Sequence, residues 1–460
     1  MHWNFEKLFA HFSRPESVDL LRQGLWGLEK ENLRVQPNGD LALSPHPPKL
    51  GPSLNHPRIT TDFSESQVEM ITAPFPSFKE ALSQLHEIEC EVVASLENDE
   101  MLWPFSMPCR LPETELIPIA QYGDSDEAKQ KETYRRGLAL RYGKMMQMIS
   151  GLHYNFSFTQ DFWDELIRVV DYSGDRDSFI SESYLHLTRN FLRDRWMLAY
   201  LFGASPVRDE SYTCKAMTPE DSEAVSLRLS RCGYSNPAKM NVSYNSLEEH
   251  LADLDDAVAT SHPPYEALGL EIDGMPQQLN ANLLQVANEF YAPIRIKPPH
   301  GDGDMLQSLH ANGAIYVEVR LVDIDPYSSC GITLQGGHLL HLFLVSFLLN
   351  DSPSFEEGDE PKARHLQEDV ALHGQNLLKD RKEVLIKRLN ELKPLAIVLD
   401  GGKDSSYQDA LEFYQKEVAN PQNLSWKRLV DDLENSKKSF LSFGLELAKK
   451  HHESHLNPSS

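Results

Sequence analysis

The stretch GLEKENLRV, residues 27–35, reads as a β-strand and carries two acidic side chains, Glu29 and Glu31, two positions apart. Side chains at positions i and i+2 of a strand point to the same face. The two negative charges therefore lie side by side, with no lysine or arginine between them on that face. A further group or ion must therefore hold the two charges there.

Two further stretches alternate in the same way. In ISGLHYNFSF, residues 149–158, an apolar row that includes Tyr154 and Phe156 faces away from His153. In AIYVEVRLVDI, residues 314–324, an apolar row faces away from Glu318 and Arg320. Such one-sided strands are typical of an antiparallel sheet that packs one face on helices and turns the other toward water or a ligand.

Apolar residues spaced by three and four predict helices over residues 78–96, 182–201 and 247–258. The apolar run 338–349 is shorter than the roughly 20 residues of a membrane-spanning helix, so it predicts a buried helix. The chain shows no clear domain boundary. We expect a single domain over residues 1–460, with a catalytic core at about 15–350 and a mainly helical part at 351–460.

The C-terminal part predicts helices over residues 376–392 and 426–450. The last ten residues, HHESHLNPSS, allow two interpretations. Their histidines could bind a metal ion, or they could form a disordered tail, and the sequence favours the tail.

Composition excludes several classes of protein. The 460 residues carry a formal charge of -25, from 44 basic and 69 acidic side chains, which repels nucleic-acid backbones and anionic lipids. Five cysteines without a CxxC pair indicate a reducing compartment. The N-terminal sequence lacks a signal-peptide pattern, so we expect a cytoplasmic protein. Neither a P-loop, a GxGxxG motif nor a GxSxG motif occurs.

The polar faces of the strands gather potential metal ligands. Acidic oxygens with at most one histidine and no cysteine suit Mg²⁺ or Mn²⁺ rather than zinc. Each group also has a plainer interpretation: a solvated strand face for Glu29 and Glu31, a cross-strand ion pair for Glu318 and Arg320. The expected set consists of Glu29, Glu31, Asp62, Glu69, His153 and Glu318.

Several arginines stand in apolar or mixed contexts, where a guanidinium needs a carboxylate or phosphate partner. In a protein this acidic they could bind a local anion. They are Arg135, Arg228, Arg295 and Arg320.

A series of motifs, taken together, resembles bacterial glutamate-cysteine ligase of the gamma-proteobacterial type. They follow the order of that family over about residues 24–345, and they are GLEKENLRV, ITTDFSESQVEMIT, WPFSMP, IAQYG, YRRGLALRYGKMMQMISGLHYNFS, YLFGASP, SLRLSRCGY, NEFYAPIR and YVEVRLVDIDP. The segment 206–224 departs from the family pattern, and no motif is recognisable beyond about residue 350.

The resemblance implies an α+β fold related to glutamine synthetase and the guanidino kinases, in which a curved, mostly antiparallel sheet forms a cup with helices packed outside. It also implies a reaction. The family uses ATP and Mg²⁺ to convert the gamma-carboxylate of glutamate into a gamma-glutamyl phosphate, which the amine of cysteine then attacks, as the first step of glutathione biosynthesis.

The resemblance also assigns roles. The six potential metal ligands match the metal positions of the family. Arg320 and Arg135 match residues near the transferred phosphate, and Asn288 lies near the nucleotide. Glutamate binding is implied for Arg228, Gln147 and Ile149, and the cysteine pocket for Tyr134, Tyr234, Tyr291 and Phe63.

Two alternatives stay open. A related carboxylate-amine ligase could use another amine acceptor, because one methylene in a pocket is worth only about 1–3 kcal/mol. A binding protein without catalytic activity could share this fold, although every acidic position keeps a suitable residue. We expect small-molecule partners only, without nucleic acid or membrane, and a monomer.

Overall fold

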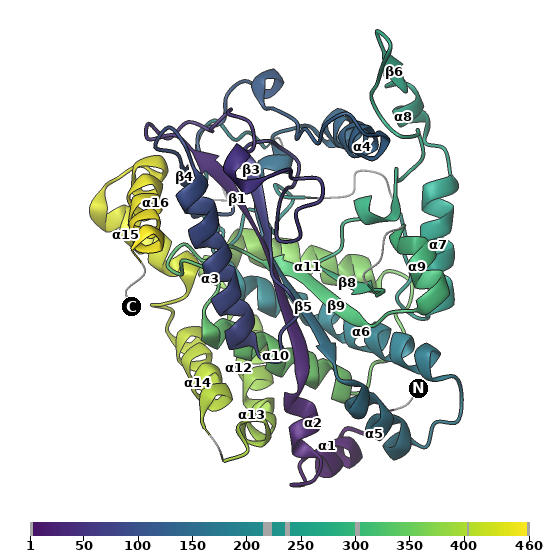
Figure 1. Cartoon of the computed structure of the whole chain (residues 1–460). Helices are drawn as coiled ribbons and strands as arrows, with labels where there is room; N and C mark the ends of the chain where they lie inside the picture. The colour runs from purple at the N-terminus through teal and green to yellow at the C-terminus, as the bar shows by residue number, and fades with distance from the viewer. Residues whose placement is uncertain (1–2, 215–222, 235–239, 300–303, 403, 458–460) are drawn as a thin grey trace.

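The computed structural model describes residues 3–214, 223–234, 240–299, 304–402 and 404–457, and is centred on one antiparallel sheet (Figure 1). Its strands follow the order β2-β3-β1-β5-β9-β8, and β4 pairs with the far end of β1. The sheet is open, with β2 and β8 at its edges. The strands are β1 (Gly24–Val35), β2 (Ile59–Thr61), β3 (Gln67–Ile71), β4 (Met101–Leu102), β5 (Leu152–Phe158), β8 (Ile294–Lys297) and β9 (Tyr316–Val322), and a separate hairpin joins β6 (Glu271–Ile272) to β7 (Met275–Pro276).

The pairing register brings the polar positions of the strands together. On β1, Glu29 lies opposite His153 of β5, and Glu31 lies opposite Glu69 of β3. On the other side of β5, Glu318 of β9 pairs with Asn155, and the register shifts between Leu152 and Tyr154. Such irregularities re-aim side chains and are frequent beside active sites. One face of the sheet thus carries a continuous polar surface.

The opposite face of the sheet is apolar and packs on helices. Tyr154 and Phe156 of β5 are fully buried there, and the Tyr154 hydroxyl accepts a hydrogen bond from the Trp26 indole at 2.8 Å and donates one to the carbonyl of Gly337 in α10. The helix α3 lies along β1 in Figure 1. The main core contains residues from β1, β5 and β9 as well as from the C-terminal helices.

The helices surround the sheet (Figure 1). They are α1 (Phe5–Phe12), α2 (Val18–Arg22), α3 (Phe78–Ser95), α4 (Asp126–Tyr142), α5 (Gln160–Val170), α6 (Arg176–Phe202), α7 (Leu247–Ala259), α8 (Pro263–Glu266), α9 (Met305–Asn312), α10 (Leu334–Leu349), α11 (Asp359–His373), α12 (Lys379–Glu391), α13 (Lys393–Asp400), α14 (Ser406–Ala419), α15 (Ser425–Ser436) and α16 (Phe440–Leu456).

The sequence predicted this mixed architecture of helices and antiparallel sheet correctly. Residues 78–96, 182–201 and 247–258 form α3, a part of α6, and α7. The side chain of Ser77 caps α3 by accepting a hydrogen bond from the amide of Glu80. The apolar run 338–349 lies within α10, which is buried over most of its length. Among the described residues, no helix is long and apolar enough to cross a membrane.

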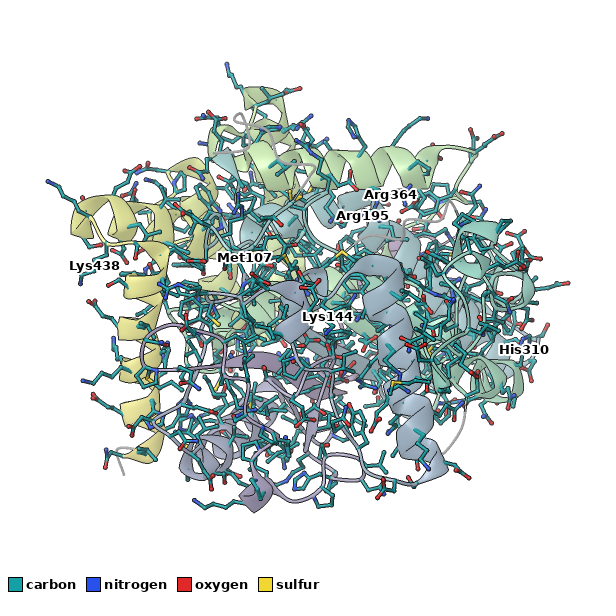
Figure 2. All side chains as sticks on the ribbon, turned by 90° about the horizontal axis from the view of Figure 1, so that it is seen from above. Met107, Lys144, Arg195, His310, Arg364 and Lys438 are labelled. Atoms are coloured by element: carbon teal, nitrogen blue, oxygen red, sulfur yellow. The ribbon has the colours of Figure 1, made fainter. Side chains whose placement is uncertain are left out.

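Two predictions about the C-terminal part were wrong. Residues 426–450 do not form one helix, because the chain turns at Lys437, whose φ of 56° is left-handed, and Ser439 caps a new helix. This turn lies at the outside of the molecule, where Lys438 points outward (Figure 2). His451, His452 and His455 are not in a disordered tail either, since α16 continues to Leu456 and buries His455 against α3. Residues 458–460 lie outside the described part of the chain.

The buried His186 of α6 makes stability depend on pH. Its Nε2 donates a hydrogen bond to the carbonyl of Asn350 at 2.6 Å, and its Nδ1 has no partner among the described residues. Burial, together with the nearby charge of Arg189, lowers the pKa of His186 to about 4. The ordinary value in an unfolded chain is about 6.5. The folded state therefore favours the neutral ring, and the stability that this ring confers is complete above pH 6.5 and is lost as the pH falls toward 4.

We expect the protonation of unfolded His186 to remove about 2 kcal/mol of stability between pH 7.5 and pH 5. His186→Gln should flatten this part of the stability curve, as measured by urea unfolding at both pH values. His365→Gln, which changes an exposed histidine of α11, is the matched control. An unchanged slope in His186→Gln would contradict the prediction.

Candidate active site

A cavity of about 300 Å³ opens on the polar face of the sheet. It is lined by side chains from β1, β3, β5, β8 and β9, from α4, and from the segments around Asp62, Arg228 and Asn288. All sixteen site residues predicted from the sequence line this cavity: Glu29, Glu31, Asp62, Phe63, Glu69, Tyr134, Arg135, Gln147, Ile149, His153, Arg228, Tyr234, Asn288, Tyr291, Glu318 and Arg320. The structure brings them together, while their individual roles stay predictions.

His153 stands between two groups of carboxylates. Its Nδ1 lies 3.1 Å from Glu29 Oε2 and 3.6 Å from Glu318 Oε1, and its Nε2 lies 3.6 Å from Glu31 Oε1. Two groups of three residues each place one ligand atom per residue within 4.8 Å of the others. The first group is Glu29, His153 and Glu318, and the second is Glu31, Glu69 and His153. Both groups have the spacing of oxygen-rich cation sites.

The carboxyl groups that line the cavity differ in the direction of their pKa shifts. Burial, with the charges of Asp62 and Glu29, raises the pKa of Glu69 well above its ordinary value. Burial and the charge of Asp62 also raise the pKa of Glu31. Burial also opposes ionisation of Glu29, but the hydrogen bond and charge of His153, together with the charge of Lys297, outweigh it and lower the pKa of that carboxyl. A cation in this position would remove the mutual repulsion.

Glu318 stands where the acidic side of the cavity meets a basic one. Lys297 Nζ and Arg295 Nη1 each lie 3.9 Å from its carboxylate oxygens, and Arg320 Nε lies at 3.8 Å. Burial opposes ionisation, but Lys297 and Arg320 outweigh it and lower the pKa of Glu318. The carboxylate is therefore ionised, although its Oε2 has no hydrogen-bond donor among the described residues.

Arg320 directs unused hydrogen-bond donors toward the cavity. Its Nε and Nη1 are buried and have no acceptor among the residues that the structure describes. Its guanidinium lies 5.6 Å from the ring centre of Tyr291. A buried guanidinium without acceptors is costly unless a ligand supplies them. The geometry fits an anion such as a phosphoryl group, whose oxygens match this planar set of donors.

Arg228 is held by the backbone at the C-terminal end of β9. Its guanidinium donates hydrogen bonds to the carbonyls of Arg320 and Val322, at 2.7 and 3.2 Å, and lies 3.4 Å from Asp323. A side chain at position 151 would displace the Arg228 guanidinium, since a Cβ there would lie 2.2 Å from Arg228 Nη2. The Gly151 amide also donates to Glu31 Oε2 at 2.8 Å, so this one residue positions both an acidic and a basic group.

Arg135 of α4 supports the loop that carries Asp62. It donates from Nε to the backbone carbonyl of Asp62, and its guanidinium packs on the ring of Tyr122 at 4.6 Å from the centre. The Tyr122 hydroxyl in turn donates to the carbonyl of Thr61 at 2.7 Å. Together these contacts hold the backbone at Thr61 and Asp62, and so they orient the Asp62 carboxylate, which lines the cavity.

Aromatic side chains form a further part of the wall. The rings of Tyr234 and Tyr291 lie 5.3 Å apart, and the Tyr234 hydroxyl donates to Gln147 Oε1 at 3.0 Å. The Nε2 of Gln147 is buried without an acceptor in the described part of the chain. The surface is apolar with a few polar atoms, which suits a small polar ligand.

The sequence did not indicate the functional position of Lys297, and it suggested Arg295 only as an isolated arginine. Both face the cavity from β8, where IRIK places them two positions apart on one side of a strand. That short alternation was the available signal. Two other residues that were missed, Leu138 and Glu289, complete the wall, and Glu289 forms a buried ion pair with Arg141 at 3.0 Å.

Comparison with known families agrees with this geometry. A family model described as glutamate-cysteine ligase matches residues 9–370. The chain belongs to the glutamate-cysteine ligase family. Two relatives named glutamate-cysteine ligase have similar sequences over 98% of this chain. That of Clostridium acetobutylicum is 39% identical and covered over 100% of its length, and that of Azotobacter vinelandii is 40% identical and covered over 89%.

Two solved structures also resemble this ligase family member. A glutamate-cysteine ligase from Francisella tularensis, solved in complex with AMP, superimposes with a TM-score of 0.86 at 29% identity, over 94% of this chain and 89% of that one. A bifunctional glutathione synthetase from Pasteurella multocida gives a TM-score of 0.81 at 27% identity, over 96% of this chain and 54% of that one. The family predicted from the motifs is confirmed.

Proposed function

We propose that this enzyme joins the gamma-carboxylate of L-glutamate to the amine of L-cysteine with consumption of ATP, as the first step of glutathione biosynthesis. Membership of the ligase family supports the reaction, and the AMP bound to the Francisella enzyme is consistent with a nucleotide substrate. The observation that carries the proposal is the buried Arg320, whose unused donors lie beside a group of carboxylates.

We further propose that the carboxylates bind Mg²⁺, with Mn²⁺ as a substitute. The donors fit, because oxygen ligands with one imidazole suit a hard cation. The raised pKa of Glu69 and the absence of a hydrogen-bond donor to Glu318 Oε2 among the described residues indicate carboxylates arranged for a further positive charge. The ions would neutralise phosphate oxygens. The residues that would hold them are Glu29, Glu31, Asp62, Glu69, His153 and Glu318.

In this proposal the chain itself positions the reactants. Arg320 and Arg135 would contact the transferred phosphoryl group, and Asn288 would contact the nucleotide. Arg228, with Gln147 and Ile149, would hold glutamate. Phosphoryl transfer needs alignment and charge neutralisation more than a protein nucleophile. The gamma-glutamyl phosphate would then be attacked by an amine held among Tyr134, Tyr234, Tyr291 and Phe63.

We also propose a cytoplasmic monomer, a single domain over residues 1–460 and a cup-shaped sheet related to those of glutamine synthetase and the guanidino kinases. The Pro206–Ala224 segment, which departs from the family pattern, precedes Arg228 in the sequence, and its residues 215–222 lie outside the described part of the chain. We therefore leave the choice of amine acceptor to be decided by a panel of amines.

A panel of amines tests the acceptor. With ATP, Mg²⁺ and glutamate, we expect phosphate release to depend on the added amine, and product mass to show gamma-glutamylcysteine. Cysteine should exceed serine, alanine and 2-aminobutyrate in kcat/KM by at least about tenfold, the lower end of what one small group contributes. A better acceptor than cysteine would replace the proposed substrate. No turnover with any amine, in folded protein that still binds ATP, would favour a binding protein.

A further inference from the structure

A second group of potential metal ligands lies outside the active site, between α3 and α16. His86 and Glu89 of α3 and His455 of α16 each place a ligand atom within 4.8 Å of the others. Cys90 follows Glu89 directly. Positions i, i+3 and i+4 of a helix share one face, so His86, Glu89 and Cys90 all face the C-terminal helix. Figure 1 shows α16 beside α3.

The distances between these atoms approach those of a tetrahedral site. Zinc binds imidazole nitrogen and carboxylate oxygen at about 2.0–2.2 Å and thiolate sulfur at about 2.3 Å, so the edges of the tetrahedron are about 3.3–3.6 Å. Glu89 Oε2 lies 3.1 Å from His455 Nε2, and Cys90 Sγ lies 3.7 Å from His86 Nε2. The His86 and His455 rings are 5.1 Å apart between centres. His86, Glu89 and His455 form the compact part of this group, and Cys90 adjoins it through His86, so the Cys90 side chain would have to rotate to bring its thiol onto the same ion.

Unsatisfied nitrogen atoms accompany this geometry. His455 is only 5% exposed, and its Nδ1 is buried without a hydrogen-bond partner among the described residues. The same is true of His452 Nδ1, one turn earlier on α16. Both rings line a small cavity together with His451 and Ser328. The His455 atom that faces Glu89 is Nε2, so the unpaired Nδ1 atoms indicate a water or another partner in the small cavity beside the cluster.

Lys30 and His455 each engage one oxygen of Glu89, so a bound cation would replace the contact between Glu89 and His455. Lys30 projects from β1 on the face opposite to Glu29 and Glu31, and its ammonium pairs with Glu89 Oε1 and with the carbonyl of Ser329. The second oxygen, Oε2, faces His455. Ionisation of Cys90 on metal binding, with release of its proton to solvent, would add a negative charge that offsets the nearby Lys30.

We propose that His86, Glu89, Cys90 and His455 form a binding site for a zinc-class transition-metal ion that joins the C-terminal helix to α3. Two imidazoles and a thiolate select such an ion over Mg²⁺, which prefers oxygen ligands. The site would hold α16 against the helix that packs along β1. It is chemically distinct from the active-site cavity, since none of the described residues that line that cavity is a cysteine.

Cobalt substitution tests this proposal on the full-length protein. Titration with Co²⁺ should produce a thiolate-to-cobalt charge-transfer band in the near ultraviolet that saturates at one equivalent and disappears when Zn²⁺ is added. Cobalt bound in the active-site cavity cannot produce this band, because it lacks a thiolate. The readout is therefore independent of ligase activity, and failure of one proposal leaves the other intact.

Two variants and one control complete the test. Cys90→Ser should abolish the band and weaken Zn²⁺ binding by at least about 100-fold, because even the loss of groups that only support metal ligands costs 10–100-fold. His455→Asn should weaken binding similarly and remove the rise in Tm that Zn²⁺ causes. Cys214→Ser, which changes a cysteine outside the cluster, should behave as wild type. Absence of the band in wild type, or its persistence in Cys90→Ser, would overturn the proposal.

Discussion

Glu29→Gln is expected to lower kcat by about 10²–10³-fold, the range observed when one charge-stabilising group is removed from an active site. Glutamine keeps the shape of the side chain and can still meet His153 and the amide of Asn155, which donates to Glu29 Oε1 at 2.8 Å. It loses the negative charge that the proposed Mg²⁺ site requires. The fold should persist, because the side chain lines a cavity rather than the apolar core.

The measurements are kcat, the Mg²⁺ concentration needed for half-maximal activity, and Tm. We expect kcat to fall, the Mg²⁺ requirement to rise, and Tm to change little. Glu113→Gln removes an exposed carboxylate and should leave all three unchanged. Activity near that of wild type in Glu29→Gln would refute the assignment of this residue as a metal ligand.

Arg320→Lys is expected to reduce kcat by a similar factor of about 10²–10³. Lysine keeps a positive charge but lacks the planar pair of donors, and charge alone does not reproduce a bidentate contact to phosphoryl oxygens. The donors that would be lost are Nε and Nη1, which have no acceptor among the described residues. The effect should therefore appear mainly in catalysis, with a smaller change in the KM for glutamate.

Single-turnover formation of ADP separates the steps, since a slow first turnover would locate the defect in phosphoryl transfer. Arg168→Lys, at an exposed position of α5, serves as the control for the same chemical change. If Arg320→Lys retained a wild-type rate of ADP formation, the buried guanidinium would have a structural role only.

The sequence predicted side chains that line one cavity, and their roles stay predictions. Alternation with period two shows which side chains share a face, and this places Glu29 with Glu31 and Glu318 with Arg320. It does not show which strands are neighbours. The register that sets Glu29 opposite His153 joins residues 124 positions apart, and only the order of family motifs suggested it. Lys297 was missed because β8 spans only Ile294–Lys297, too short for periodicity to stand out.

The burial of the C-terminal helix could not be predicted from sequence for a different reason. Charged and histidine-rich sequence in residues 451–460 resembles a solvated tail when considered alone. Its burial depends on Glu89, a carboxylate hidden in α3 with no exposed surface, which pairs with both Lys30 and His455. No local pattern connects residues 366 positions apart. Polar residues that stabilise one another across such a distance resemble surface residues in a one-dimensional sequence.

Lys30 connects β1, the strand that lines the active site, to the helices behind the sheet. Its neighbours Glu29 and Glu31 face the cavity, while Lys30 itself reaches backward to Glu89 and so to α16. A protein shortened to the family-matched residues 9–370 would keep every side chain that lines the cavity. It would also lose the helix that covers Glu89. The residues that line the active site therefore end before residue 370. The contacts that hold β1 in place, from Lys30 through Glu89 to His455, extend into α16.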